Sequence, residues 1–344
     1  MRGNGITYDT GFVNAGVSTH EPFNDDVVKR EMGVIHDVLH CNVVRLTGGD
    51  QGRLEIAAHH AAAAGLEVWW CPFTCDLTIE ALLTCVADCA ERAERLRQQG
   101  AAVVLLVGSE LSLFNRGFLP GETLQDRLGV LTAPDRLREL LPQVPPRIND
   151  FLGRATALAR ARFGGRIGYA SLPFEGVDWT PFDIISTDAG YRSADNAHRF
   201  RDDIRAFVAR GQALSKTVAI TEFGCCTYRG AADQGGRGDK IIEWDGATPV
   251  QLNGKYIRDE DEQATYLVEV LDTFNAEGVD TAFVNTFARY DLPHRPHPRR
   301  DLDMASYGVV KVLQDRPGAT PDMAWEPKVA FTVLAEYYRG SRRP

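Results

Sequence analysis

The sequence predicts an α/β fold in which eight parallel strands close into a (β/α)₈ barrel. Eight short segments rich in Val, Ile and Leu recur along the 344 residues, and helical patterns separate most of them. The first strand–helix turn lacks the glycine-rich fingerprint with which an open, doubly wound sheet binds phosphate. Because no Ser/Gly-rich or proline-rich linker divides the chain, we expect a single domain over residues 1–344.

The expected strands have the near-continuous apolar character of strands that are covered on both faces. They span residues 5–13, 42–46, 66–70, 104–110, 166–171, 183–187, 217–224 and 281–287. One helical pattern is expected at 24–40, and a second, alanine-rich one ends at residue 65. Further helices are expected at 78–99, 147–163, 196–210, 259–276 and 327–338. We expect Asn24 to cap the first helix and Gly65 to end the second. The segment between the fifth and sixth strands has little room for a full helix.

Two connections are much longer than an ordinary strand–helix loop. Residues 115–146 follow the fourth strand, and residues 225–258 follow the seventh. Both would lie on the rim that carries the active site in a barrel of this kind. The glycines of 225–258 and its Trp244 predict a lid or substrate-facing insertion.

Charge and composition narrow the class of ligand. The formal net charge of −9 argues against a nucleic acid or an anionic membrane surface, and neutral or cationic small molecules fit better. No run approaches the roughly 18 apolar residues of a membrane span, and the N-terminus has no apolar signal segment. We therefore expect a cytoplasmic protein, and the sequence leaves its oligomeric state open.

The cysteines do not predict a metal site. Cys71 and Cys75, like Cys85 and Cys89, are separated by three residues, whereas zinc knuckles usually have the tighter Cys-x₂-Cys spacing. An odd total of seven in a long chain is also unlike a disulfide scaffold. We expect mostly free thiols, and neither a metal nor a cofactor.

Two of the expected strands end in a glutamate. The fourth runs into Glu110 and the seventh into Glu222, each after a buried-looking apolar run. Since the carboxyl ends of all barrel strands lie on one rim, the two side chains can converge across its mouth. The pattern predicts a paired-carboxylate site.

The residues around these glutamates resemble a known superfamily. Ser109-Glu110 after the fourth strand and Thr221-Glu222-Phe223-Gly224 in the seventh are similar to the motifs of retaining glycoside hydrolases with a TIM barrel, glycosidase clan A. The resemblance implies that Glu110 is the acid/base, that Glu222 is the nucleophile and that Arg45 supports the nucleophile. Segments 258–267 and 325–331 are similar to the opening of the family's seventh helix and to its final helix.

The sequence departs from the family pattern at two places. Ser109 stands where the family carries an asparagine that contacts the sugar 2-hydroxyl, and its shorter side chain would reach a sugar only through water. The family's strand-eight tryptophan platform has Phe287 as its nearest counterpart.

Retaining hydrolysis needs two carboxyl groups about 5–5.5 Å apart, one protonated and one ionised. An Arg45 cation beside Glu222 would keep that carboxylate ionised while Glu110 keeps its proton. The alternative is that each glutamate merely caps a strand or pairs with a nearby base. The matched positions favour the paired reading.

Further residues are candidates for substrate binding. Tyr191 is expected to donate a hydrogen bond to the nucleophile or the ring oxygen, and His20 to bind a substrate hydroxyl. Trp244 and Phe287 are expected to offer faces on which a sugar stacks. Ordinary packing is the alternative for each of the four.

Two other functions stay open at this point. A catalytically degenerate barrel would bind a saccharide or a protein partner, and Ser109 favours that alternative. The same carboxylate pair could also serve non-hydrolytic chemistry, because a barrel constrains the fold far more than the reaction.

Overall fold

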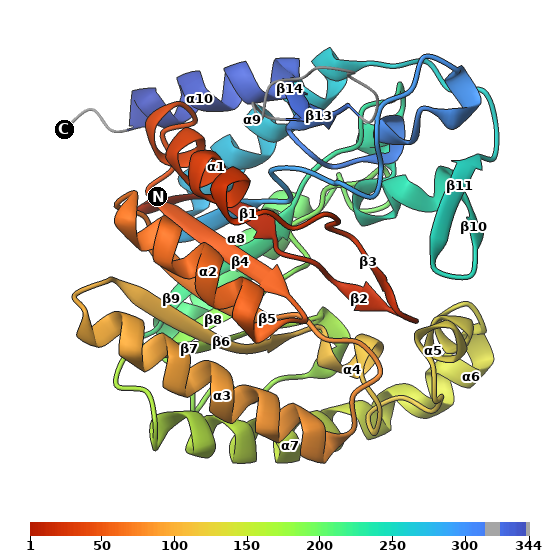
Figure 1. Cartoon of the computed structure of the whole chain (residues 1–344). Helices are drawn as coiled ribbons and strands as arrows, with labels where there is room; N and C mark the ends of the chain where they lie inside the picture. Colours follow the sequence, from red (N-terminus) through yellow and green to blue (C-terminus); the bar gives the residue numbers. More distant parts are fainter. Residues whose placement is uncertain (314–323, 342–344) are drawn as a thin grey trace.

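The computed structural model describes residues 1–313 and 324–341, and within them eight parallel strands form one ring (Figure 1). Neighbouring strands follow the order β7-β6-β5-β4-β1-β12-β9-β8. Their bounds are β1 (Gly3–Asp9), β4 (Val43–Gly48), β5 (Glu67–Pro72), β6 (Val103–Ser109), β7 (Arg166–Ala170), β8 (Ile184–Thr187), β9 (Thr217–Phe223) and β12 (Thr281–Val284). A parallel bridge between Ser171 and Thr187 joins β7 to β8. The predicted (β/α)₈ TIM barrel is confirmed.

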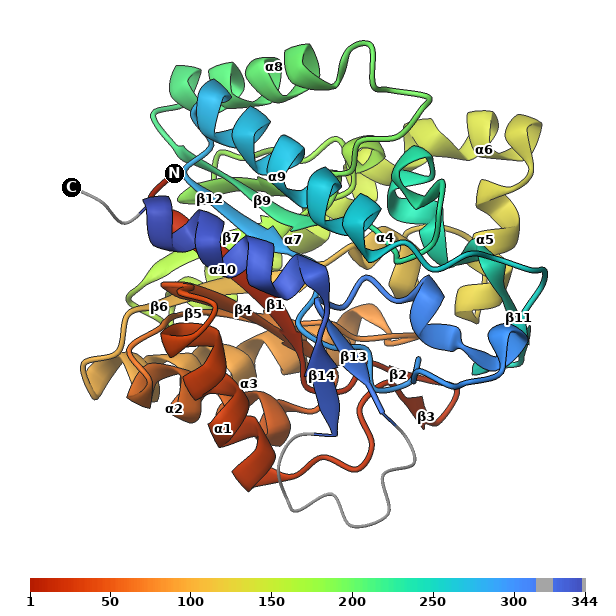
Figure 2. The ribbon, with the colours of Figure 1, turned by 90° about the horizontal axis from the view of Figure 1, so that it is seen from above.

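Helices surround the ring. They are α1 (Asp25–Asp37), α2 (Gln51–Ala63), α3 (Ile79–Gln98), α7 (Val144–Arg160), α8 (Phe200–Ala213), α9 (Glu260–Glu277) and α10 (Val329–Ser341). Figure 2 shows α8 and α9 on one side of the strands and α1, α2 and α3 on the other. The Asn24 side chain caps α1 by accepting from the Val27 N–H, and Gly65 follows α2 with a φ of +90°. Both terminus predictions are confirmed.

Several boundaries differ from the prediction for local reasons. The Asp9 carboxylate accepts the N–H groups of Gly11 and Phe12, so β1 stops at Asp9 and the chain turns there. The next residues form a small hairpin, β2 (Val13–Asn14) and β3 (Val17–Ser18). The connection between β7 and β8 contains only a 3₁₀ turn, η2 (Pro173–Glu175), as its length predicted.

The two long connections are partly structured. Residues 115–146 follow the short α4 (Leu111–Phe114) and contain α5 (Leu124–Leu131), α6 (Pro134–Leu140) and η1 (Leu141–Gln143). Residues 225–258 contain η3 (Ala231–Asp233), η4 (Gly235–Ile241) and an antiparallel hairpin of β10 (Ile242–Asp245) and β11 (Thr248–Leu252). In Figure 1, α5, α6 and this hairpin lie beyond the carboxyl ends of the barrel strands.

The interior of the barrel is a packed core. Trp69 and Phe283 meet inside it with ring centroids 4.9 Å apart, and both are fully buried. A Cβ on Gly5 would lie 2.6 Å from the Phe283 ring, so this close approach requires glycine. The interior is therefore a packed core and not a pore, and in barrels of this kind the active site lies at the rim.

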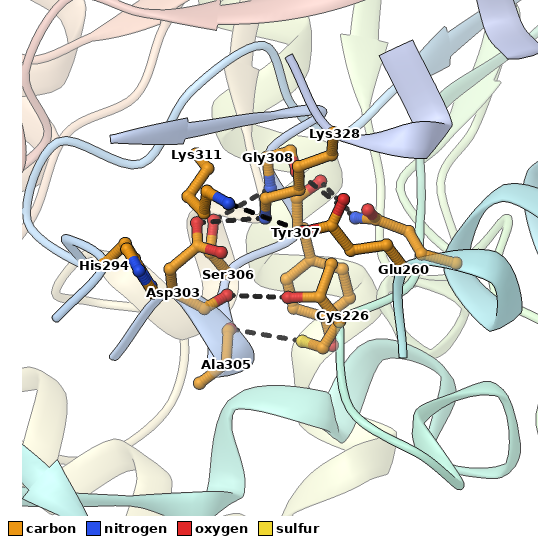
Figure 3. A network of polar contacts seen from close by, with 12 residues as sticks. Cys226, Glu260, His294, Asp303, Ala305, Ser306, Tyr307, Gly308, Lys311 and Lys328 are labelled. Carbon is orange, nitrogen blue, oxygen red and sulfur yellow. Dashed lines mark hydrogen bonds and ion pairs between the residues drawn. The ribbon is translucent and has the colours of Figure 1, made fainter. Parts of the chain in front are cut away.

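A buried ion network lies around Asp303, in the loop that follows β12 (Figure 3). Asp303 lies 3.0 Å from the Lys328 ammonium and 2.8 Å from the Arg258 guanidinium. The network joins the two segments, 258–267 and 325–331, that the sequence resemblance singled out. Within the described residues, Lys328 Nζ and Asp303 Oδ1 have no hydrogen-bond partner, so each depends on the charge of the other at 3.0 Å.

In the described part of the chain, no helix is both long enough and apolar enough to cross a membrane. All seven cysteines lie in that part, and no disulfide joins any two of them there.

We predict that Asp303→Asn destabilises the fold by about 3 kcal/mol or more, because it leaves a buried ammonium without its counter-charge. Lys328→Met should cost clearly less, since Arg258 still neutralises Asp303. Urea unfolding measures both free energies. Asp135→Asn, in a pair whose side chains are 80% and 95% exposed, is the control and should change stability by less than about 1 kcal/mol. Equal losses for all three variants would contradict the assignment.

Candidate active site

The two predicted glutamates meet at the mouth of the barrel, together with a third carboxylate. Glu110 follows β6, Glu222 lies in β9, and Asp188 follows β8. One carboxylate oxygen of each lies within 4.8 Å of one from each of the others. This separation is close to the 5–5.5 Å or so that retaining glycosidases use.

The backbone turns sharply to direct Glu110 into the mouth. Glu110 has φ 46° and ψ 38°, the left-handed region that non-glycine residues seldom occupy. Its N–H donates to the Ala170 carbonyl at 2.9 Å, which continues the pairing of β6 with β7 through this turn. Strain of this kind, on the order of 1 kcal/mol, is common where a side chain must be aimed at a reacting group.

Arg45, on β4, lies beneath the carboxylates and is 1% exposed. Its Nη1 donates to the Thr221 carbonyl at 2.8 Å and lies 3.1 Å from Asp188 Oδ1 and 3.5 Å from Glu222 Oε2. The expected contact with Glu222 is therefore present, but Asp188 has the shorter one. Clustered carboxylates are also the ligands that hard divalent cations such as Ca²⁺ and Mg²⁺ prefer. Here a guanidinium from the protein supplies the positive charge.

Two neutral donors hold Glu222 from the other side. The Tyr191 hydroxyl donates to Glu222 Oε1 at 2.6 Å. Asn285 Nδ2 donates to the same oxygen at 3.0 Å and to the Tyr191 hydroxyl oxygen at 2.9 Å. The Glu222 side chain keeps 21% of its surface exposed, so a ligand can still reach the carboxylate.

The surroundings raise the proton affinity of both glutamates. Burial raises the pKa of Glu222 to about 7, the Asp188 charge acts in the same direction, and Arg45 and Tyr191 oppose both. The pKa of Glu110 is raised well above its ordinary value by burial, and then by Asp188, Glu222 and Glu175. The Arg45 cation and the Tyr191 hydroxyl thus favour the ionised form of Glu222, whereas burial and the neighbouring carboxylates favour the protonated form of Glu110.

A buried fourth carboxylate supports the turn at Glu110. Glu175 accepts hydrogen bonds from the Ser112 hydroxyl at 2.6 Å, the Tyr169 hydroxyl at 2.8 Å and the Leu172 N–H at 2.9 Å. Burial raises its pKa to about 7. It thus ties the segment that follows the Glu110 turn to the end of β7.

Three predicted substrate-binding residues are almost entirely buried, which argues against direct contact with a ligand. Ser109 is 0% exposed and donates to Asp188 Oδ2 at 2.7 Å. Phe287 is 0% exposed, with ring centroids 6.0 Å from Tyr8 and 5.3 Å from Trp325. His20 is 2% exposed and stacks on Tyr290 at 4.0 Å. Neighbours distant in sequence cover all three.

Trp244 is 46% exposed on β10, in the predicted insertion. The insertion packs beside the site through η4. The Gly238 N–H donates to the Tyr307 hydroxyl at 2.7 Å, and the Tyr307 ring lies 5.8 Å from that of Tyr191. A Cβ on Gly236 would lie 3.2 Å from the Tyr191 ring, so glycine allows the close packing.

The sequence reasoning missed Asp188, Asn285 and Glu175. Asp188 directly follows the expected sixth strand, Asn285 lies within the expected eighth, and Glu175 lies in the short connection between β7 and β8. A search for every polar residue at the carboxyl end of a strand would have found the first two. No local pattern indicates that Glu175 is buried.

Comparisons with known proteins agree with the fold. The sequence matches no protein-family model and no curated protein. A GH113 β-mannanase from Alicyclobacillus acidocaldarius is similar, with 16% identity and a TM-score of 0.59 over 98% of this chain and 97% of that one. An exo-β-1,4-mannosidase from Opitutaceae bacterium strain TAV5 matches with 14% identity and a TM-score of 0.54, over 98% of this chain and 59% of that one.

A GH99 endo-α-mannosidase from Bacteroides thetaiotaomicron has 10% identity and a TM-score of 0.54, over 99% of this chain and 97% of that one. At such identities the likeness defines the fold. The chain has the TIM-barrel fold that these glycoside hydrolases share.

We predict that Glu175 makes stability fall as the pH rises. Its folded pKa of about 7 exceeds the unfolded value of about 4.3, so the folded state holds the extra proton and loses stability across that window. Glu175→Gln should flatten this decline in thermal unfolding curves recorded from pH 4 to pH 8. Glu336→Gln, on the exposed face of α10, should leave it unchanged. An unaltered slope in the Glu175 variant would contradict the assignment.

Proposed function

We propose that this protein is a retaining glycoside hydrolase with Glu222 as the nucleophile and Glu110 as the acid/base. The observation that carries the proposal is the meeting of two glutamates at the mouth of the barrel, with carboxylate oxygens within 4.8 Å of each other and with Arg45 and Tyr191 in contact with Glu222. The likeness in fold to glycoside hydrolases supports it.

In the first step the Glu222 carboxylate attacks the anomeric carbon and forms a glycosyl ester. The glycosidic C–O bond breaks, and Glu110 gives its proton to the departing oxygen. Tyr191, Asn285 and Arg45 hold the attacking carboxylate in place. No metal or cofactor is needed to balance the step.

In the second step Glu110 accepts a proton from water, the water oxygen attacks the anomeric carbon, and Glu222 leaves as a carboxylate. The Glu222 charge is one of the causes that raise the pKa of Glu110. Since the ester removes that charge, the pKa of Glu110 falls in the intermediate, and Glu110 becomes able to act as a base.

The substrate we propose is a neutral glycoside or oligosaccharide. A net charge of −9 disfavours anionic ligands. Two of the compared structures are a β-mannanase and an exo-β-1,4-mannosidase, so β-mannosides are the first substrates to test.

A saccharide-binding barrel without turnover is the second candidate. Ser109 favours it, because the asparagine of the resembled family contacts the sugar whereas Ser109 is buried against Asp188. Sugar binding without hydrolysis or covalent labelling would support this candidate.

We expect Glu110→Gln to lower kcat/KM by about 10²–10⁴-fold, the usual contribution of a general acid. Glu222→Ala should lower it at least as much, because no ester can form. Both are measured on aryl glycosides and on oligosaccharides.

Mass spectrometry after incubation with 2-deoxy-2-fluoro glycosides should locate a covalent sugar on Glu222. Glu336→Gln is the matched control and should keep full activity. Near-wild-type turnover in either active-site variant would refute the proposal.

We also predict that Trp244→Ala raises KM by roughly 2- to 10-fold with little change in kcat, if its exposed face stacks on a sugar in the bound state. Val250→Ala, at a 51% exposed position on the paired strand β11, controls for changes in the hairpin itself. Equal KM values for the two variants would exclude Trp244 from substrate binding.

A further inference from the structure

Asp188 is a buried carboxylate that the proposed mechanism uses neither as acid, nor as base, nor as nucleophile. It directly follows β8, and its side chain is 0% exposed. Its N–H donates to the Ser171 carbonyl at 3.0 Å, at the seam where β7 and β8 close the barrel. Its position is therefore held by the backbone of the ring.

Asp188 and Ser109 hold the Arg45 guanidinium together. Arg45 Nη2 donates to Ser109 Oγ at 2.9 Å, and the Ser109 hydroxyl donates to Asp188 Oδ2 at 2.7 Å. Arg45 Nη1 lies 3.1 Å from Asp188 Oδ1, an oxygen with no hydrogen-bond partner in the described part of the chain, so this oxygen depends on the Arg45 charge. The three side chains form a closed triangle.

Two carboxylates share the single positive charge of Arg45. Arg45 Nη1 lies 3.1 Å from the Asp188 carboxylate and 3.5 Å from that of Glu222, so its electrostatic attraction to Asp188 is the stronger. Asp188 also lies close to Glu110, as part of the same carboxylate cluster. The charged or titratable groups that face Asp188 are Arg45 from β4, Cys71 from β5, Glu110 after β6 and Glu222 from β9.

We propose that Asp188 is a positioning residue that, with Ser109, fixes the Arg45 guanidinium and divides its charge between Asp188 and Glu222. The consequence for turnover rests on the proposed function. The negative charge of Asp188 makes both glutamates hold their protons to higher pH. It thereby sets the pH range in which Glu222 is ionised while Glu110 is protonated.

The arrangement accounts for the serine at position 109. The Ser109 hydroxyl accepts a hydrogen bond from Arg45 and donates one to Asp188 in a space that is fully enclosed. In this chain, residue 109 therefore acts through Arg45 and Asp188, not through a sugar.

The test is Asp188→Asn, which keeps the shape and removes the charge. Titration of the side-chain carboxyl carbons by ¹³C NMR, assigned with Glu110→Gln and Glu222→Gln, follows both glutamates without any substrate. Their midpoints should move to lower pH by about one unit, because a neighbouring negative charge has gone. Both limbs of the pH profile of kcat/KM should move the same way.

Ser109→Ala keeps the Asp188 charge but removes the hydroxyl that donates to it. Asp188 should then interact more strongly with Arg45, which leaves less positive charge for Glu222. The titration midpoint of Glu222 should therefore move to higher pH. If circular dichroism shows that Asp188→Asn is unfolded, the shift of the Glu222 midpoint in Ser109→Ala is sufficient to test the proposal. Asp202→Asn, on α8 with a side chain 74% exposed, makes the same change of charge far from the mouth and should not move the midpoints.

Midpoints in Asp188→Asn that stay at the wild-type values would overturn the proposal. So would a Ser109→Ala shift to lower pH. A third outcome separates the two proposals. If the midpoints move as predicted but the protein neither hydrolyses nor is labelled by any glycoside, the role of Asp188 is supported and the glycosidase assignment is refuted.

Discussion

The mouth of this barrel depends on one buried cation. The Arg45 guanidinium reaches acceptors from several strands, namely Ser109 on β6, Asp188 after β8, and Thr221 and Glu222 on β9. A buried charge costs several kcal/mol unless partners surround it, so the strand ends are arranged around this side chain. Glu222, the proposed nucleophile, and Asp188 are the carboxylates that neutralise it.

The filled interior explains why the chemistry lies at the rim. Trp69 and Phe283 occupy the centre of the barrel, and Gly5 makes room for them. Above the Trp69 and Phe283 rings, each strand ends in a polar residue or continues into a loop. The ring therefore presents Glu110, Asp188 and Glu222 over an apolar base, where burial raises the pKa of both glutamates.

A second set of contacts braces the site from outside. Gln263 of α9 is fully buried, and its amide donates to the Cys225 carbonyl at 2.7 Å, two residues beyond β9. The ion pairs of Asp303 with Arg258 and Lys328 hold the loop after β12 against the start of α9. Tyr307, in the same loop, packs on Tyr191 and binds the insertion at Gly238. Glu222 is thus held through contacts that extend to Lys328, just before α10.

The sequence by itself determined the alternation of strands and helices, and with it the barrel, because period and composition are local properties. It also determined that Glu110, Arg45 and Glu222 end up on one rim, since the ends of parallel strands share it. Only the tertiary structure decided that Asp188 and Ser109 pair with Arg45, that Asn285 joins Tyr191 on Glu222, and that Phe287 and His20 are enclosed. Those outcomes depend on which strands become neighbours when the ring closes and on what packs over each side chain, and residues far apart in the chain decide both.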